Sequence, residues 1–402
     1  MSSRTRLLVF LVSTPLVVLV AVGGIVGART PAQRAGAPLR VFEDVIRYIL
    51  GAYVEEVNID KVMDGAMRGL ADGLDPSSAY LTPAEAKSFT SASPAPAGEV
   101  GLVMTRQFYL RVIGVRDGSP ADRAGLQTGD FVRAINGIAT RDMSALTGNR
   151  LLRGEPGSKI SLLVIRGNAA DPHTIDLVRE APKGEAVTSR KLPGGEAFVR
   201  VASFGSATAN ALRTTIGSLG PAANTGVLID LRGVADGTPE DGIAAARLFV
   251  KSGVIATLAG RAESSRTVTS AQAGDGALAM PVTLLVSNGT AHAAEVFASA
   301  LSANKRAQLV GEPTAGLAAV QRLVRLPDGH ALWMTHSRYL QADGTPIHER
   351  GLRPDEAVEI PVIGFDEAKP TTDQVLTAAV KALRSMILQQ GKTDGSQPGT
   401  PR

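Results

Sequence analysis

The 402-residue sequence contains no cysteine. This absence excludes disulfides, thiolate catalysis and zinc sites built on sulfur, and it is compatible with an oxidising compartment. Aromatic residues make up only 4% of the chain, and no run of Lys and Arg is interleaved with stacking side chains. Nucleic-acid binding therefore has no support. The five His show no ligand spacing such as H-E-x-x-H, so we expect neither a metal nor another cofactor.

Charge of one sign is not in large excess either. The formal net charge is +4, and residues 1–28 contain Arg4 and Arg6 but no acids, so removing these two charges leaves +2 for the remainder. Apolar residues make up 44% of the chain, which is enough for ordinary cores. The length allows two or three domains.

The apolar run from Leu7 to Gly27 follows the two N-terminal arginines. At roughly 21 residues it is long enough to span a bilayer. Because Val26-Gly27-Ala28 resembles a small-residue cleavage site, residues 1–28 are open to two interpretations, an uncleaved signal anchor or a removed signal peptide. Secretory apolar regions are usually only about 7–15 residues long, which favours an anchor in the inner membrane through residues 7–27. In either case, positive charge before the run predicts a periplasmic or otherwise extracytoplasmic location for the rest.

After Glu180 the sequence alternates strand and helix patterns, which predicts an α/β core. The expected strands are Ala197–Val201, Val227–Asp230, Val282–Val286, Gln308–Val310 and Ala331–Thr335. The expected helices are Leu39–Leu50, Val62–Leu70, Thr208–Leu219, Glu240–Val250 and Thr372–Gln390.

The segment Pro281–Ser302 predicts a strand, a tight turn and a helix. The apolar run to Val286 forms the strand, Asn288-Gly289 the turn, and Thr290–Ser302 the helix. Small residues at such a junction let a side chain lie exposed beside the helix N-terminus, where free N–H groups stabilise negative charge. A catalytic serine is expected at this kind of junction.

This segment resembles the nucleophile-bearing region of the carboxyl-terminal processing peptidases, or tail-specific proteases, which pair a serine with a lysine base. The matching residues are Gly289, Glu295, Ala300-Leu301, Lys305-Arg306-Ala307, Gly311-Glu312, Thr314, Gly316 and Val320-Gln321. In this register the nucleophile position is His292 and the lysine position is Leu317. Gln321, which the family uses to orient the lysine, is in place. The resemblance therefore implies that no catalytic pair is intact.

Each altered position also has a simpler structural interpretation. His292 is expected to be a solvated or hydrogen-bonded side chain at a helix start, and Leu317 a packing residue in the lysine's former space. Thr290 is a candidate substitute nucleophile, although a helix N-cap hydroxyl is the commoner use of such a residue. The family's oxyanion loop, D-L-R-N-N-P-G-G, corresponds to Asp230–Gly237, and its paired glycines become Asp236 and Gly237. Asp236 introduces a carboxylate where the family stabilises an anion.

The rest of the chain follows the same family in order. Leu74–Thr82 is similar to the motif L-D-P-H-S-S-Y-L-T, and Gly351–Asp355 resembles G-I-x-P-D. Residues from Gly98 to about Glu180 resemble a PDZ domain, whose Asn136-Gly137 independently predicts a hairpin turn. The resemblance implies that the loop before its edge strand holds the C-terminal carboxylate of a partner. That loop consists of Gly101, Leu102, Val103 and Met104.

The implied fold is α/β, a crotonase- or Clp-protease-like core with an inserted PDZ domain and a helical N-terminal segment. The expected boundaries are 1–28 for the anchor or signal peptide, 38–95 for the helical segment, 98–182 for the PDZ domain, 183–363 for the core, 366–390 for a C-terminal helix and 391–402 for a disordered tail. Two functions compete. One is an envelope pseudoprotease that binds protein C-termini as a scaffold or regulator, with an active envelope peptidase as a candidate partner. The other is an active serine-type endopeptidase that uses an unrecognised nucleophile.

Overall fold

The computed structural model describes residues 31–90, 96–167, 171–365, 367 and 370–394. The apolar run expected to anchor the chain, residues 7–27, lies outside these ranges. Within them, no helix has both the length and the apolar character needed to cross a membrane. The chain divides into two compact units, Met1–Ala66 and Met67–Arg402.

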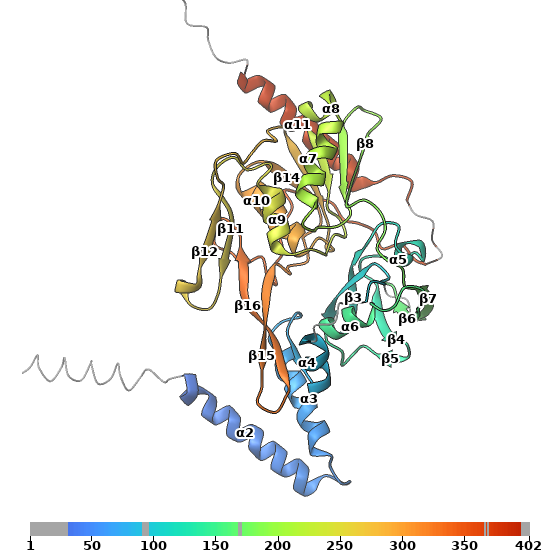
Figure 1. The fold of residues 1–402 in the computed structure, drawn as a ribbon, viewed down its shortest axis with the longest axis vertical. Coiled ribbons are helices and arrows are strands. Elements are labelled where there is room, and N and C mark those ends of the chain that lie inside the picture. Colours follow the sequence, from blue (N-terminus) through green and yellow to red (C-terminus); the bar gives the residue numbers. More distant parts are fainter. Residues whose placement is uncertain (1–30, 91–95, 168–170, 366, 368–369, 395–402) are drawn as a thin grey trace, which may run out of the picture. The chain divides into compact units, whose positions relative to one another are not determined.

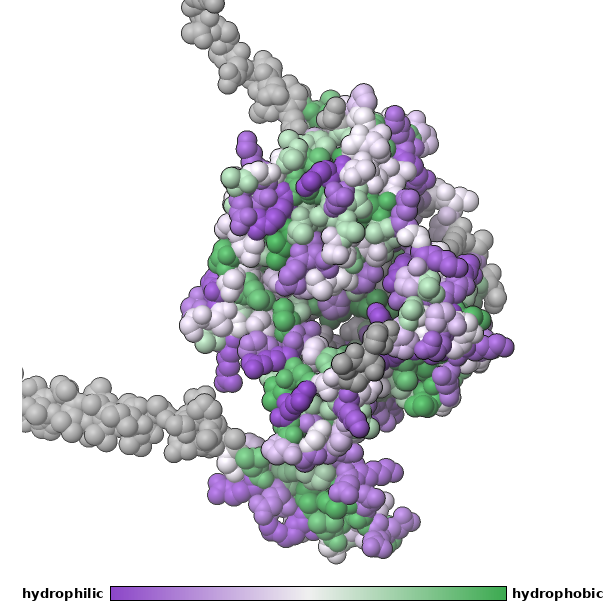
Figure 2. Space-filling model, in the orientation of Figure 1, coloured by the Kyte–Doolittle hydropathy of each residue, from purple (hydrophilic) through white to green (hydrophobic). Residues whose placement is uncertain are grey.

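The first unit is helical, as the sequence predicts. Helix α2 (Pro31–Ala52) contains the expected Leu39–Leu50 pattern, and α3 (Ile59–Asp72) begins in the same unit. Several large apolar side chains of α2 are exposed, and Figure 2 shows apolar surface on the N-terminal helices. These exposed side chains include Leu39, Val41, Val45, Tyr48 and Leu50.

Within the second unit, the segment that resembles a PDZ domain forms a separate β-sheet (Figure 1), and we call this segment the PDZ domain. Its sheet has the order β2-β3-β4-β6-β7, with β5 paired to β4. These strands are β2 (Leu102–Gln107), β3 (Tyr109–Val115), β4 (Phe131–Ile135), β5 (Ile138–Ala139), β6 (Lys159–Ile165) and β7 (His173–Val178), and the helices are α5 (Pro120–Arg123) and α6 (Ala145–Leu151). The hairpin predicted at Asn136-Gly137 is present, and both residues have the positive φ that such a turn requires, 49° and 79°.

A mostly parallel sheet forms the centre of the core, with the order β17-β14-β13-β10-β9-β8. Its strands are β8 (Val187–Lys191), β9 (Ala197–Val201), β10 (Val227–Asp230), β13 (Val282–Val286), β14 (Ala307–Gly311) and β17 (Glu356–Ala357). Both faces are covered, which explains why β10 and β13 are buried at every position. One face packs against α7 (Thr208–Ser218), α9 (Pro239–Ala246) and α10 (Ala293–Ala303), and the other packs against α11 (Gln374–Asp394).

A second, antiparallel sheet joins the N-terminal motif to the core. It has the order β1-β16-β11-β12, and β15 pairs with β16. Its strands are β1 (Ala79–Leu81), β11 (Val254–Ala259), β12 (Thr267–Ser270), β15 (Ala319–Arg325) and β16 (Ala331–Leu340). Helix α4 (Pro83–Thr90) follows β1 directly. The mixed α/β fold and the helical N-terminal segment that the sequence predicts are therefore present.

Two of the element ends that differ from the sequence prediction lie at the start of α10 and at the end of α11. Helix α10 begins at Ala293 instead of Thr290. Helix α11 continues through Asp394, so the first residues of the expected disordered tail are helical.

Candidate active site and peptide groove

Residues 287–292, which we call the elbow, join β13 to α10. The hydroxyl of Thr290 donates a hydrogen bond to the carbonyl of Leu231 at 2.9 Å and accepts one from the N–H of Ser287 at 3.0 Å. The Thr290 side chain is fully buried. The expectation that it caps the helix is wrong, because these bonds use the hydroxyl within the elbow and the N-cap residue is His292.

His292 has a rare backbone conformation, with φ 49° and ψ −114°. Non-glycine residues seldom adopt positive φ, and such strain concentrates at functional sites. The side chain is partly buried and makes no capping hydrogen bond. Burial lowers the pKa of His292, a hydrogen bond with the Leu317 backbone opposes this effect, and nearby His348 lowers the pKa further. The lowered pKa favours the neutral imidazole near pH 7.

Glu295 connects the elbow to the loop that contains residue 317. This fully buried carboxylate accepts hydrogen bonds from the Thr314 hydroxyl at 2.5 Å, the Gly316 N–H at 2.6 Å and the Leu317 N–H at 2.8 Å. A backbone hydrogen bond from His292 also reaches it. The sequence analysis did not identify Glu295 as a site residue, although an acidic residue at the third position of a helix is a capping signal.

The Leu317 side chain lies in a small apolar cluster between the core and the PDZ domain. The cluster consists of Ile113, Ala235, Ala291 and Leu317. Leu317 is only 5% exposed, and Ile113 belongs to PDZ strand β3. Gln321 lies on β15, where its Nε2 donates to Thr335 Oγ1 at 3.4 Å.

The carboxylate of Asp236 contacts the backbone of Phe204 and the side chain of Arg116. Asp236 Oδ1 accepts a hydrogen bond from the Phe204 N–H at 3.1 Å, and Oδ2 lies 3.8 Å from the Arg116 guanidinium. Burial raises the pKa of Asp236, and these two contacts oppose the rise. Gly237 has φ 83°, and a Cβ there would lie 2.4 Å from the Phe204 Cβ, so only glycine fits.

A buried histidine that the sequence analysis did not single out lies near the elbow. His348 is 5% exposed, and neither ring nitrogen has a hydrogen-bond partner among the described residues. Its Nε2 lies 3.9 Å from Asp75 Oδ2, and Asp75 itself accepts hydrogen bonds from the N–H groups of Ser77 and Ser78. Across the described ranges, no group of three or more His, Asp or Glu side chains is arranged to hold a metal ion.

The predicted carboxylate loop lies at the start of β2. Gly101 has φ 78°, and a Cβ there would lie 2.2 Å from the Ser119 Cβ, so the sharp turn into the strand requires glycine. The side chains of Leu102 and Met104 are buried, whereas Val103 is partly buried. Strand β2 is the terminal strand of its sheet. The Met104 backbone already has a hydrogen-bond partner, Asn149 on α6.

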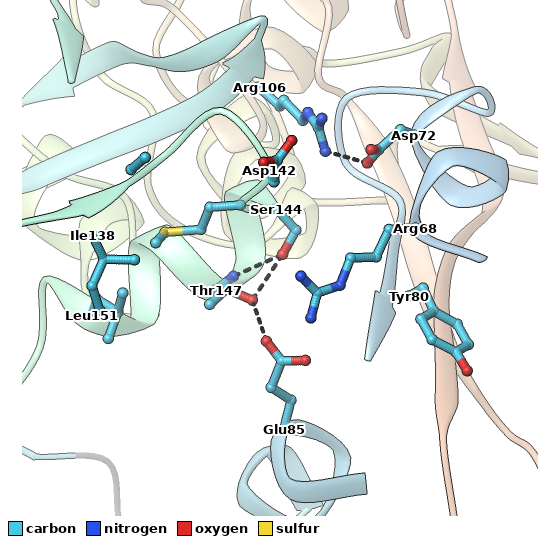
Figure 3. Close-up of a pocket in the computed structure, with 12 residues that line it drawn as sticks. Arg68, Asp72, Tyr80, Glu85, Arg106, Ile138, Asp142, Ser144, Thr147 and Leu151 are labelled. Carbon is cyan, nitrogen blue, oxygen red and sulfur yellow. Dashed lines mark hydrogen bonds and ion pairs between the residues drawn. The ribbon is translucent and has the colours of Figure 1, made fainter. Parts of the chain in front are cut away.

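A cavity of about 430 Å³ lies beside α6 (Figure 3). The residues lining it include Arg68, Asp72, Tyr80, Glu85, Arg106 and Thr147. Figure 3 shows two connections across it, an ion pair of Arg106 with Asp72 and a hydrogen bond from Thr147 Oγ1 to Glu85 Oε1 at 3.2 Å. The C-terminal turn of α3 and helix α4 are thereby fastened to the PDZ domain.

Comparisons with known proteins agree with this architecture. The model of peptidase family S41 matches residues 196–358, and a PDZ domain model matches residues 111–166. The carboxy-terminal processing protease CtpA of Bacillus subtilis is 31% identical over 313 residues, which cover 77% of this chain and 66% of that protein. The carboxy-terminal-processing protease of Bartonella bacilliformis is 29% identical over 82% of this chain and 77% of its own length.

A solved structure supports the same assignment. The photosystem II D1 C-terminal processing protease is 27% identical, and the match covers 81% of this chain and 94% of that chain with a TM-score of 0.65. The matched part of this chain spans about two thirds of the Bacillus relative, 66% of its length. By its two domain models, its relatives and its fold, the chain belongs to the carboxyl-terminal processing protease family, S41 peptidases that carry a PDZ domain.

Proposed function

We propose that this member of the family binds protein C-termini without hydrolysing them. Acyl transfer by a serine–lysine site needs a hydroxyl nucleophile and an amine base within hydrogen-bonding distance. The aligned positions hold a neutral imidazole at His292 and an alkyl side chain at Leu317. Leucine cannot act as a base, and a neutral histidine without a partner is a poor acyl acceptor.

The observation that carries the proposal is the environment of Leu317. Its side chain is only 5% exposed and packs against the apolar side chains of Ile113, Ala235 and Ala291. A lysine base acts in its neutral form, after its ammonium group has lost a proton near neutral pH. The residue at position 317 would therefore have to carry an amine. The space is instead closed by apolar contacts that include a PDZ residue.

The alternative, hydrolysis through Thr290, has less support. A substitute nucleophile must reach the substrate carbonyl and transfer its proton to a base. The Thr290 hydroxyl is buried, and its hydrogen goes to the carbonyl of Leu231.

The test is a direct assay of the purified full chain. We expect no hydrolysis above buffer of an unfolded protein with an apolar C-terminus, and no labelling by a fluorophosphonate probe, because no activated hydroxyl lies at the elbow. Mass spectrometry of the intact protein measures the labelling. Stoichiometric modification of any Ser or Thr would overturn the proposal, and a carboxyl-terminal processing protease with an intact serine serves as the positive control.

Binding does not require the missing catalytic groups. A peptide C-terminus can add as a strand to a free sheet edge while backbone N–H groups hold its carboxylate. Strand β2 is the terminal strand of its sheet, and Gly101 turns the chain into it. We therefore assign peptide binding to the PDZ domain, through residues 101–104.

We further propose that the protein works outside the cytoplasm, next to the inner membrane. Arg4 and Arg6 precede the apolar run 7–27, and positive charge stays on the cytoplasmic side. A reporter fused after Arg402 should be active only when it is a periplasmic type, such as alkaline phosphatase. Activity of a cytoplasmic reporter at the same position would contradict this orientation.

A further inference from the structure

One backbone position of the proposed peptide edge is already occupied by a side chain of the protein itself. The N–H of Met104 donates a hydrogen bond to Asn149 Oδ1 at 2.9 Å, and Asn149 Nδ2 donates one to the Met104 carbonyl at 2.7 Å. A side-chain amide presents one acceptor and one donor side by side, as a peptide strand does when it pairs with a neighbouring strand. Asn149 therefore satisfies both backbone groups of Met104.

The helix that carries Asn149 packs tightly on the strand. A Cβ at the preceding residue, Gly148, would lie 2.1 Å from Leu110 Cδ1 and 3.4 Å from Met104 Cε. Helix α6 therefore lies directly against the sheet, and a peptide can pair with the Met104 backbone only if the Asn149 amide moves away.

The outer side of α6 is also held. Thr147 donates to Glu85 on α4, and Arg150 donates to Ser88 with its guanidinium 5.8 Å from the Phe89 ring. Helix α6 is thus fixed between β2 and α4, and these contacts oppose a movement that would open the groove.

We infer that Asn149 is an internal substitute for the partner's main chain, and that it determines which peptides the groove accepts and how tightly. The inference rests on the proposed peptide-binding function. A partner must replace both hydrogen bonds of Met104, because a buried carbonyl or N–H left unpaired is costly. This requirement favours an extended C-terminal strand with free main-chain groups over a lone carboxylate. Such a peptide binds only to molecules in which Asn149 has left the Met104 backbone. The apparent affinity therefore falls in proportion to the fraction of these molecules.

The test compares the full chain with its Asn149→Val variant. Each is titrated by calorimetry with a decapeptide that ends in Leu-Val, either with a free carboxylate or as the amide. Because valine cannot compete for Met104, we expect the variant to bind the free-carboxylate peptide at least about tenfold more tightly than wild type, the effect of losing two neutral hydrogen bonds. The amide should gain less.

Two further variants control for indirect effects. Thr147→Val removes the contact of α6 with Glu85 but leaves both hydrogen bonds of Asn149, so any gain in affinity should be clearly smaller than that of Asn149→Val. Asn149→Asp keeps an acceptor for the Met104 N–H but offers no donor to its carbonyl, so its affinity should lie between wild type and Asn149→Val. This variant provides a second test if the valine variant folds poorly.

Hydrogen-exchange mass spectrometry of the segment 102–107 gives an independent measurement. Exchange should be faster in Asn149→Val than in wild type, and the free-carboxylate peptide should slow it again. Equal peptide affinities of wild type and folded Asn149→Val would overturn the role of Asn149 but would leave the proposed peptide binding intact. Absence of binding by either protein would overturn both this role and the proposed function.

Discussion

Replacing Glu295 by alanine is expected to lower the free energy of unfolding by about 3 kcal/mol or more, because several buried donors lose their common acceptor. The carboxylate is fully buried and is the acceptor for Thr314, Gly316 and Leu317. Without it, these donors lie in the core without a partner, and each unpaired group costs about 1–3 kcal/mol, although the costs do not add fully. Urea unfolding followed by the fluorescence of Trp333, the chain's single tryptophan, measures the change.

Glu312→Ala is the matched control for this prediction. Glu312 lies just after β14 and accepts longer hydrogen bonds from the N–H groups of Asn288 at 3.4 Å and Ile360 at 3.3 Å. It is only partly buried, so its loss should cost less than about 1 kcal/mol. Similar losses in the two variants would show that Glu295 is not the main connection between the elbow and residues 314–317.

The same carboxylate gives the stability a distinct pH dependence. Burial raises the pKa of Glu295 from 4.5 to about 7, against the effect of its hydrogen bonds. Since the folded state binds this proton more tightly than the unfolded state, its contribution to stability is complete below about pH 4.5 and is lost as the pH rises to about 7, by about 1.4 kcal/mol per pH unit. Glu295→Gln has no proton to lose, so its stability should lack this decline. Parallel pH profiles for the two proteins would contradict the shift.

The second large effect concerns restored catalysis. We expect the double variant His292→Ser, Leu317→Lys to hydrolyse a substrate at least about 10²-fold more slowly than the triple variant that adds Asp236→Gly. The carboxylate of Asp236 opposes the negative charge that develops at the oxyanion, and we expect this to cost as much as the loss of one oxyanion donor, about 10²–10³ in rate. A lysine among Ile113, Ala235 and Ala291 would have a lowered pKa, which favours its action as a base. The carboxylate of Asp236 would remain beside the loop that must stabilise negative charge.

Matched variants separate the contributions to this result. His292→Ser with Leu317→Met keeps the apolar cluster but has no base, so it should be inactive with or without Asp236→Gly. The rate of the active variant should rise with pH as the lysine loses its proton. Equal rates for the double and triple variants would show that Asp236, held by Phe204 and Arg116, does not impede the reaction.

The sequence was sufficient for most of the core. Strands such as Ala197–Val201 and Val227–Asp230 are buried on both faces, so they read as short apolar runs whose ends are easy to find. The start of α10 was predicted three residues too early. Thr290 and Ala291 are compatible with a helix, and the positive φ of His292 that ends the turn has no signature in hydrophobic periodicity.

The site was less predictable because its contacts are distant in sequence. Asn149 lies 45 residues from Met104, and a single amide in a short helix looks like a surface residue. His348 lies far along the chain from its neighbour Asp75. Glu295 could have been recognised as a capping residue. Its hydrogen bonds to residues 314–317 could not, because they depend on the path of the loop that connects β14 to β15.

The geometry of the elbow does not depend on what residue 292 does chemically. Its backbone is held by Glu295 and by the buried hydroxyl of Thr290, so it offers a fixed attachment point at the N-terminus of α10. Because the chain has no cysteine, His292→Cys would create its single thiol, where the helix N-terminus favours the reactive thiolate. A spin label, a fluorophore or a synthetic catalyst could then be coupled at residue 292 and at no other position. The backbone at this residue would stay fixed by the contacts of Glu295 and Thr290.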